Sequence, residues 1–255
     1  MTAATRTPPP PALGALARLA RRPAAWASLA FLAALTLLPY STPLFHALFP
    51  DLARPLYTRA SFLDLALSHA GLVAAASLVV VIAGVGIGVF VTRPAGRDFA
   101  GPVDTLTAVG QTFPPTAVLA LAVPMIGYGG APTVLALIAY GLLPVVSATV
   151  AGIGAVPPAT LQAADGLGLS PAGRLIKVEL PLAAPVILSG VRTSVILNIG
   201  TATIGSTVGA LTLGSPIIEG LSGSNPAYVV QGAILVGLFA VATDLWFDEL
   251  ERRVA

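Results

Sequence analysis

The chain has 255 residues, of which 56% are hydrophobic and 9% are charged, and its formal net charge is +2. Soluble domains carry about 25% charged residues, so a chain with a mean hydropathy of +0.89 is expected to lie in a lipid bilayer. The small positive charge does not indicate nucleic acid as a partner. The lack of cysteine and the spacing of the two histidines, His46 and His69, argue against a metal site and a catalytic site built on those residue types.

The first 22 residues are rich in proline and then in arginine, and they contain no acidic residue. This composition is compatible with the n-region of a cleaved signal peptide. The length of the basic lead, and the first crossing that the later segments require, favour an uncleaved anchor instead. We therefore predict a cytoplasmic N-terminal tail over residues 1–22 and a transmembrane domain over residues 23–255.

Six apolar segments follow the tail, and a helix that crosses a bilayer needs roughly 20 mostly apolar residues. The expected fold class is therefore an all-α polytopic membrane protein with about six transmembrane helices. Proline residues inside the third and fourth segments are expected to kink or interrupt them. The predicted segments are Ala24–Tyr40, Ala70–Val91, Val103–Gly127, Pro132–Ile153, Pro185–Leu213 and Val229–Phe247.

The basic residues favour one orientation of these segments. If the N-terminus is cytoplasmic, ten of the thirteen Lys and Arg residues fall on the inner side, and only Arg54 and Arg59 fall on the outer side. This distribution follows the positive-inside rule and predicts a multi-pass protein of the cell membrane with both termini in the cytoplasm. The remaining Arg192 lies inside the fifth segment, where it either extends to the interface or pairs with an acid such as Asp244.

The fifth segment interleaves glycine with serine and threonine. Small residues let transmembrane helices approach closely, and hydroxyl groups bond across helices, so tight packing is one interpretation. The other is a helix that lines a translocation path, and the two are compatible because a path wall must also pack. The candidate path residues are Thr193, Asn198, Thr201, Thr203, Ser206 and Thr207.

A polar loop over residues 156–182 interrupts the apolar pattern with the sequence LQAADGLGLSPAGRLIKVELP. A proline pair, PP, suits the start of a first helix, and Gly168 suits a left-handed end of that helix. Ser170, followed by a proline, predicts the N-cap of a second helix, which is expected to end at Pro181 where the chain re-enters the membrane. This shape is suited to docking a cytoplasmic partner, and a solvated connector is the alternative.

The stretch QAADGLGLSPAGRLIKVELP resembles the EAA signature of permease subunits in binding-protein-dependent ABC importers. That signature runs Glu-Ala-Ala, three residues, Gly, nine residues, Ile, one residue and Leu-Pro. The chain matches it in register over 20 residues, with Gln in place of Glu and Val in place of Ile. The matching residues are Gln162, Ala163, Ala164, Gly168, Val178, Leu180 and Pro181.

The resemblance implies a type I ABC importer permease in which the first helix of the loop is a coupling helix that docks on a separate ATPase subunit. ATP would be bound by that partner, so no cofactor and no catalytic residue are expected in this chain. A second permease copy or homologue and a separate extracytoplasmic substrate-binding protein are the other implied partners. The ATPase-coupling residues that the resemblance implies are Leu161, Gln162, Ala163, Ala164, Asp165, Gly166 and Gly168.

The segments on either side of the loop, from Gln111 to Asp244, resemble osmoprotectant-type permeases, which implies import of quaternary-ammonium compounds such as glycine betaine, choline or carnitine. An amino-acid- or methionine-type importer permease shares the same signature and is the alternative; an ion-coupled secondary transporter is another. Aromatic cages bind quaternary ammonium groups. The 16 aromatic residues here are scattered along the sequence, so the cage is expected on the binding protein.

Overall fold

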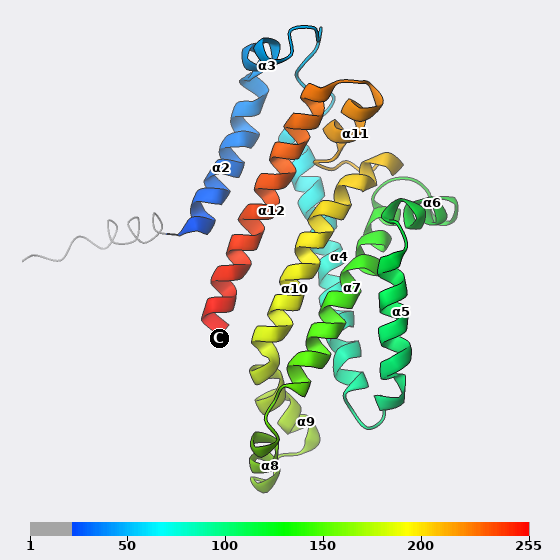
Figure 1. Ribbon diagram of the computed structural model, residues 1–255, viewed down its shortest axis with the longest axis vertical. Coiled ribbons are helices and arrows are strands. Elements are labelled where there is room, and N and C mark those ends of the chain that lie inside the picture. The colour runs from blue at the N-terminus through cyan, green and yellow to red at the C-terminus, as the bar shows by residue number, and fades with distance from the viewer. Residues whose placement is uncertain (1–21, 255) are drawn as a thin grey trace, which may run out of the picture.

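The structure, a computed structural model, describes residues 22–254, and every regular element within them is a helix. Five helices are long and apolar enough to cross a membrane, and they run along the long axis of an elongated bundle (Figure 1). The predicted all-α polytopic class is confirmed, whereas the predicted tail lies, except for its last residue, outside the described residues. The five spans are Pro23–Tyr40, Phe62–Val91, Gly130–Gly154, Pro171–Val208 and Pro226–Val254.

The first and last spans form one edge of the bundle. Helix α2 (Pro23–Leu37) continues into the short 3₁₀ helix η1 (Leu38–Tyr40), and it lies beside α12 (Pro226–Val254) in Figure 1. The rings of Phe31 and Phe239 stack across this edge, with 5.4 Å between their centroids. The first predicted segment is therefore confirmed, and the last one extends further at its charged C-terminal end than its apolar stretch predicted.

Helix α4 (Phe62–Val91) begins with a complete N-cap. The hydroxyl of Ser61 accepts a hydrogen bond from the backbone N–H of Asp64 at 3.0 Å, and the Asp64 carboxylate lies in the first turn, where the helix dipole favours negative charge. With this cap the helix begins at Phe62, eight residues before the predicted start at Ala70. The helix thus takes in Asp64, Ser68 and His69, whose polar side chains interrupt the apolar pattern of its first two turns.

Helices α4, α7 (Gly130–Gly154) and α10 (Leu180–Ala202) form the centre of the bundle, where Leu137 and Ile199 are fully buried. Small residues set how closely they approach. A β-carbon at Gly88 of α4 would lie 2.5 Å from Cβ of Thr149 in α7, which is too close for any other residue type. Glycine at position 88 is thus required for α4 and α7 to pack at this distance.

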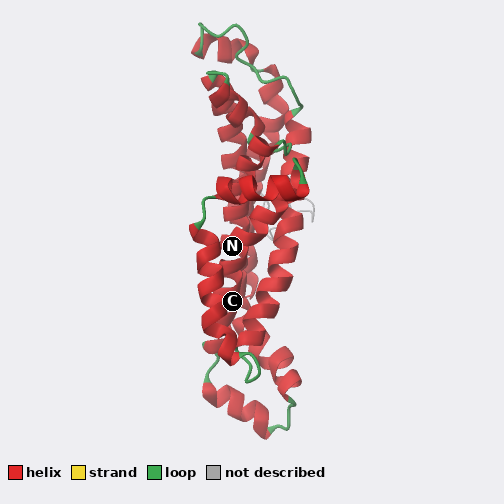
Figure 2. Cartoon of the chain, turned by 90° about the vertical axis from the view of Figure 1, so that its right-hand side faces the viewer, coloured by secondary structure: helices red, strands yellow, loops and turns green. Residues whose placement is uncertain are grey.

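The third predicted segment is two helices rather than one. Helix α5 (Ala100–Thr112) runs beside α7, and α6 (Pro115–Ile126) lies across the bundle (Figures 1 and 2). The break falls at Phe113, whose extended backbone (ψ 135°) follows from the proline that comes next, because the proline ring disfavours helical geometry in the preceding residue. The proline pair therefore interrupts this segment completely.

The loop helix and the fifth predicted segment form one continuous helix. Helix α9 (Pro171–Arg174) passes through a π-helical turn, η3 (Leu175–Glu179), into α10 and then into the 3₁₀ helix η4 (Thr203–Val208). The predicted end at Pro181 is wrong: the N–H of Leu180 bonds to the carbonyl of Leu175, five residues back, and this wide turn makes room for the proline ring. The predicted extension to residue 213 is also wrong, because Gly209 turns left-handed, with φ +83°.

Short helices cap the two ends of the bundle. Helices α3 (Thr42–Leu48) and α11 (Ser215–Ser222) lie at one end, and α8 (Pro158–Gly166) lies with α9 at the other (Figure 1). The 3₁₀ helix η2 (Arg97–Phe99) connects α4 to α5. The loop elements are therefore segregated from the membrane-length helices.

The predicted pair between Arg192 and Asp244 is present. Nε of Arg192 lies 2.7 Å from one carboxylate oxygen of Asp244, and Nη2 lies 2.8 Å from the other. Nη1 of the same guanidinium also donates to Glu251 at 2.9 Å. This cation therefore ties α10 to two positions of α12 that lie about two turns apart, and its bidentate geometry is the form that binds carboxylates most strongly.

Replacing Arg192 by alanine is expected to lower the free energy of unfolding by about 2 kcal/mol, because the Asp244 and Glu251 carboxylates lose their shared partner in a partly buried site. The thermal midpoint in detergent measures this loss. Arg252→Ala is the matched control. Arg252 is 61% exposed and pairs with Asp248 on its own helix, so its loss should cost less than about 0.5 kcal/mol. Equal losses for the two variants would contradict the prediction.

Candidate functional site

Helix α8 and its turn project beyond the membrane-length helices at one end of the bundle (Figure 1). The helix begins directly after Pro157, whose extended backbone serves as the N-cap. It ends at the predicted glycine: Gly168 has φ +75°, a conformation that side chains with a β-carbon rarely adopt. The N–H of Leu169 then bonds to the carbonyl of Ala164 at 3.2 Å, which closes the turn.

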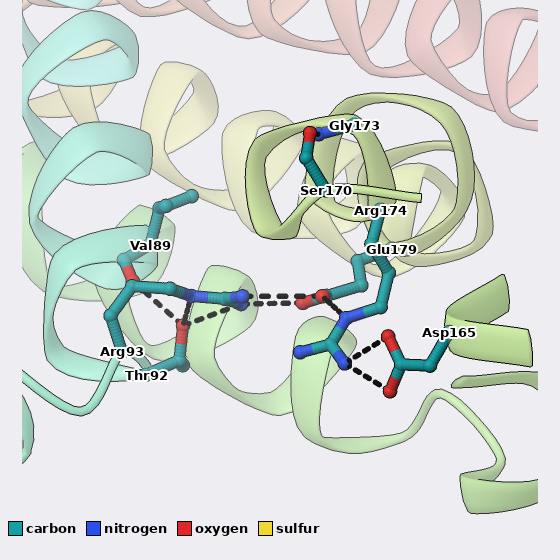
Figure 3. A network of polar contacts seen from close by, with 8 residues as sticks. All are labelled: Val89, Thr92, Arg93, Asp165, Ser170, Gly173, Arg174 and Glu179. Carbon is teal, nitrogen blue, oxygen red and sulfur yellow. Dashed lines mark hydrogen bonds and ion pairs between the residues drawn. The ribbon is translucent and has the colours of Figure 1, made fainter. Parts of the chain in front are cut away.

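The second helix of the loop starts at its predicted cap. The Ser170 hydroxyl accepts a hydrogen bond from the N–H of Gly173 at 3.1 Å (Figure 3). This cap satisfies one of the free N–H groups at the helix start. The helix–turn–helix shape predicted for the loop is therefore confirmed.

The outer surface of α8 differs from the predicted docking face. Gln162 and Ala163 are exposed as expected, but Ala164 is only 4% exposed and packs inside the chain. A 3.6-residue repeat turns two neighbouring residues about 100° apart, so one alanine faces outward while the next faces inward. The two alanines therefore do not form one flat surface for a partner.

Leu167 is a surface residue that the sequence analysis did not single out. Its side chain is 83% exposed, at the end of α8 and directly before Gly168. Its side chain is therefore available to any partner that docks on the end of α8. In the sequence, a leucine between two glycines in a hydrophilic stretch could have indicated this exposed position.

The remaining coupling candidates differ in exposure and in whether their side chains are paired. Leu161 is half-buried, whereas Gly166 and Gly168 are exposed. Asp165 is exposed and paired: Nη1 of Arg174 lies 2.8 Å from both of its carboxylate oxygens (Figure 3). Gln162 has an exposed amide in the place where the signature has glutamate, so this position of the helix carries no charge.

The six path candidates do not share one face of the chain. Thr193 and Thr207 are exposed, and their hydroxyls donate to carbonyls of their own helical turns at 3.0 Å and 2.7 Å. Thr201 and Thr203 are half-buried. Asn198 is fully buried, close to Gly141 of α7. Ser206 is half-buried, and its hydroxyl bonds to those of Thr212 and Ser215.

A second polar cluster lies at the opposite end of the bundle. The hydroxyl of Tyr57 donates to the Glu219 carboxylate at 3.0 Å, and Nε of Arg59 lies 2.9 Å from the same group. Burial, together with the neighbouring carboxylate, raises the pKa of Tyr57 well above its ordinary value. Tyr57 therefore serves as a neutral donor that holds the loop before α4 to α11.

No group of three or more His, Asp or Glu side chains within residues 22–254 is arranged to hold a metal ion. The polar side chains at both ends of the bundle pair with one another instead. The structure thus presents a bundle of membrane-length helices with a docking-shaped element at one end. That combination defines the class of a multi-pass membrane protein.

The chain belongs to the family described as "Binding-protein-dependent transport system inner membrane component", which matches residues 81–255. It is similar to the osmoprotectant import permease protein OsmY of Salmonella typhimurium, with 38% identity over 73% of this chain and 79% of that protein. It is also similar to the choline transport system permease protein OpuBB of Bacillus subtilis, with 39% identity over 70% of this chain and 83% of that protein.

The fold resembles that of a chain in the inward-facing MetNI methionine ABC transporter. The TM-score is 0.67, and the match covers 74% of this chain and 94% of the other, with 19% sequence identity. At that identity the likeness concerns the fold alone. The all-helical fold expected from the resemblance is therefore confirmed.

Proposed function

We propose that this chain is the permease subunit of an ATP-driven importer for quaternary-ammonium osmoprotectants such as glycine betaine, choline or carnitine. The observation that carries the proposal is the exposed tip of α8, where Leu167 is 83% exposed within the coupling signature. The similarity to permeases named for osmoprotectants and choline supports the substrate class.

Helix α8 docks in a cleft on a separate ATP-binding subunit, with Ala163 close against the cleft wall and Leu167 inserted into it. ATP binding and hydrolysis on that partner move α8 and thereby alternate the access of the translocation path. In this arrangement the α8 end faces the cytoplasm, as do both termini. The excess of basic residues on that side supports this orientation.

The other expected partners are a second permease and a separate extracytoplasmic binding protein. In the structure Tyr57, Phe62 and Tyr228 come together, with 5.4 Å between the ring centroids of Tyr57 and Tyr228. Tyr57 is 4% exposed, so these rings pack against one another and do not offer an open face to a cation. We therefore assign the aromatic cage for the substrate to the binding protein.

Proteoliposomes that contain this chain, its ATPase subunit and its binding protein test the proposal. Uptake of radiolabelled choline or glycine betaine is expected to require internal ATP and to survive an ionophore that removes ion gradients. Competition by excess unlabelled carnitine, and no competition by methionine, is expected from the substrate class.

Two outcomes would contradict parts of the proposal in different ways. Uptake that proceeds without the ATPase and disappears with the ionophore would identify an ion-coupled secondary transporter. ATP-dependent uptake of methionine instead of choline would keep the importer and reject its substrate class. Proteoliposomes that lack only the binding protein are the matched control.

A further inference from the structure

Helix α8 has little apolar contact with the rest of its own chain. Ala164 is its one buried residue, and burial of its methyl group contributes about 1 kcal/mol at most, while Leu161 is only half-buried. A helix that a partner displaces must nevertheless be fixed to the helices that it moves. Polar contacts therefore add to that attachment.

A chain of four charged side chains leads from α8 to the end of α4 (Figure 3). Asp165 accepts from Nη1 of Arg174, and Nε of Arg174 donates to Oε1 of Glu179 at 3.0 Å. Glu179 also accepts from both terminal nitrogens of Arg93, with 3.2 Å between Nη1 and Oε1. The charges alternate in sign along the chain, so every link is attractive.

The end of this chain on α4 is held in a fixed orientation. The Thr92 hydroxyl accepts from Nε of Arg93 at 3.2 Å and from Nη2 at 3.1 Å. The same hydroxyl donates to the carbonyl of Val89 in the last turn of α4 at 2.7 Å. The Thr92 hydroxyl therefore holds the Arg93 guanidinium in a fixed orientation at the end of α4.

Glu179 is the centre of the chain and its least exposed member. Its side chain is 4% exposed, compared with 25% for Arg93 and 27% for Arg174. Charges screened from water interact more strongly than surface pairs. Loss of one guanidinium leaves the Glu179 carboxylate with only one of its two cationic partners. Loss of Glu179 leaves the positive charges of Arg93 and Arg174 without the carboxylate that separates them.

The π-helical turn provides this geometry. It spans Leu175–Glu179 and has Glu179 as its last residue. Because a π turn contains one residue more than an α turn, it changes the direction in which Glu179 leaves the helix relative to the apolar face of α10. The carboxylate thereby reaches a cation that is 86 residues away in the sequence.

We propose that Arg174 and Glu179 are positioning residues that lock the coupling helix α8 to the end of α4, so that a displacement of α8 moves α4 and α10 together. This inference rests on the proposed importer function and adds the route of force transmission within the subunit. Without the lock, α8 still docks on the ATPase, but its motion no longer reaches the membrane helices.

The test compares Arg174→Ala, Glu179→Gln and the conservative Arg174→Lys in proteoliposomes with the ATPase and binding protein. The measured quantity is substrate transported per ATP hydrolysed. Arg174→Ala and Glu179→Gln should lower it by about tenfold while ATP hydrolysis continues, and Arg174→Lys should restore part of it. Lys177→Ala, which removes an exposed cation from the same π turn, should leave the ratio unchanged.

A distance measurement on the complete, assembled transporter provides the second readout. The chain has no cysteine, so spin labels attach only at introduced sites, and Ala95 and Ala159 are exposed positions beyond α4 and on α8. Arg174→Ala should broaden the label–label distance distribution, and Lys177→Ala should leave it narrow.

The outcomes separate this inference from the function on which it rests. Absence of ATP-dependent uptake by the wild-type chain would reject the importer function. Normal uptake by wild type, with an unchanged transport-to-hydrolysis ratio and an unchanged distance distribution in Arg174→Ala, would overturn the lock alone. Since Glu179→Gln risks misfolding, the milder Arg174→Ala decides between these results.

Discussion

Ala163→Arg is expected to reduce ATP-driven uptake by roughly tenfold or more while the chain still folds, since central interface residues dominate binding energy. Ala163 lies on the exposed side of α8, and its methyl group lets a partner surface approach the helix closely. An arginine there adds a long charged side chain that the partner's cleft must accommodate. The folded permease should therefore lose its ATPase subunit during copurification and retain its thermal midpoint.

The same substitution at the next residue, Ala164→Arg, is expected to affect folding first and not docking. Ala164 is buried within the chain, so an arginine there should lower the thermal midpoint before any effect on docking can be measured. Ala172→Arg makes the same chemical change at an exposed position of α9 and should leave both readouts near wild type. Normal copurification of the Ala163→Arg variant would reject α8 as the docking helix.

Gly190→Ala is expected to destabilise the chain by about 2 kcal/mol, because it overpacks the contact between α10 and α7. A β-carbon at Gly190 would lie 2.2 Å from Cβ of Ala148 and 2.7 Å from the backbone carbonyl oxygen of Pro144. Neither atom belongs to the flexible end of a side chain, so α7 and α10 must move apart. The thermal midpoint in detergent should fall, and expression of folded protein should fall with it.

The matched control is the same substitution at Gly200, in the same helix. An added β-carbon there has no heavy atom within 4 Å, and alanine has a higher helix propensity than glycine. Gly200→Ala should therefore leave the midpoint unchanged or raise it slightly. Equal losses at Gly190 and Gly200 would show that helix packing is not the cause.

The membrane class and most helix positions were predictable because they depend on properties that act locally. An apolar stretch of membrane length, the N-cap at Ser170 and the left-handed end at Gly168 each depend on a few neighbouring residues. The break at Phe113 was also signalled by the prolines that follow it, although the segment was counted as a single crossing. The start of α4 was missed because Asp64, Ser68 and His69 interrupt the apolar pattern of its first two turns.

The candidate coupling face was predicted only in part. The register of the signature located α8, and the exposure of Gln162 and Ala163 agrees with a role in docking. Spacing along the sequence did not reveal that Ala164 faces inward or that Leu167 is exposed. Those two facts depend on how α8 lies against the following helix.

For the path candidates too, the sequence did not show which side chains face the interior of the bundle. Hydroxyl and amide side chains on one segment suggested a common wall, but Asn198 is buried near Gly141, and Ser206 bonds to two hydroxyls beyond the end of its helix. Which side of a membrane helix faces its neighbours is decided by the fit of several helices at once. The role of the exposed Thr193 and Thr207 in transport stays a prediction.

The sequence by itself determined that the chain lies in a lipid bilayer and that it is helical. It also located the polar loop and its resemblance to a coupling signature. These features were readable because the scarcity of charged residues and the residues that form turns are properties of single segments. The tertiary structure alone decided that Arg93 and Glu179, 86 residues apart, meet beside α8. The physical reason is that an ion pair requires its partners within about 4 Å. That proximity follows only from the packing of α4 against α7 and α10 and from the π turn that directs the carboxylate.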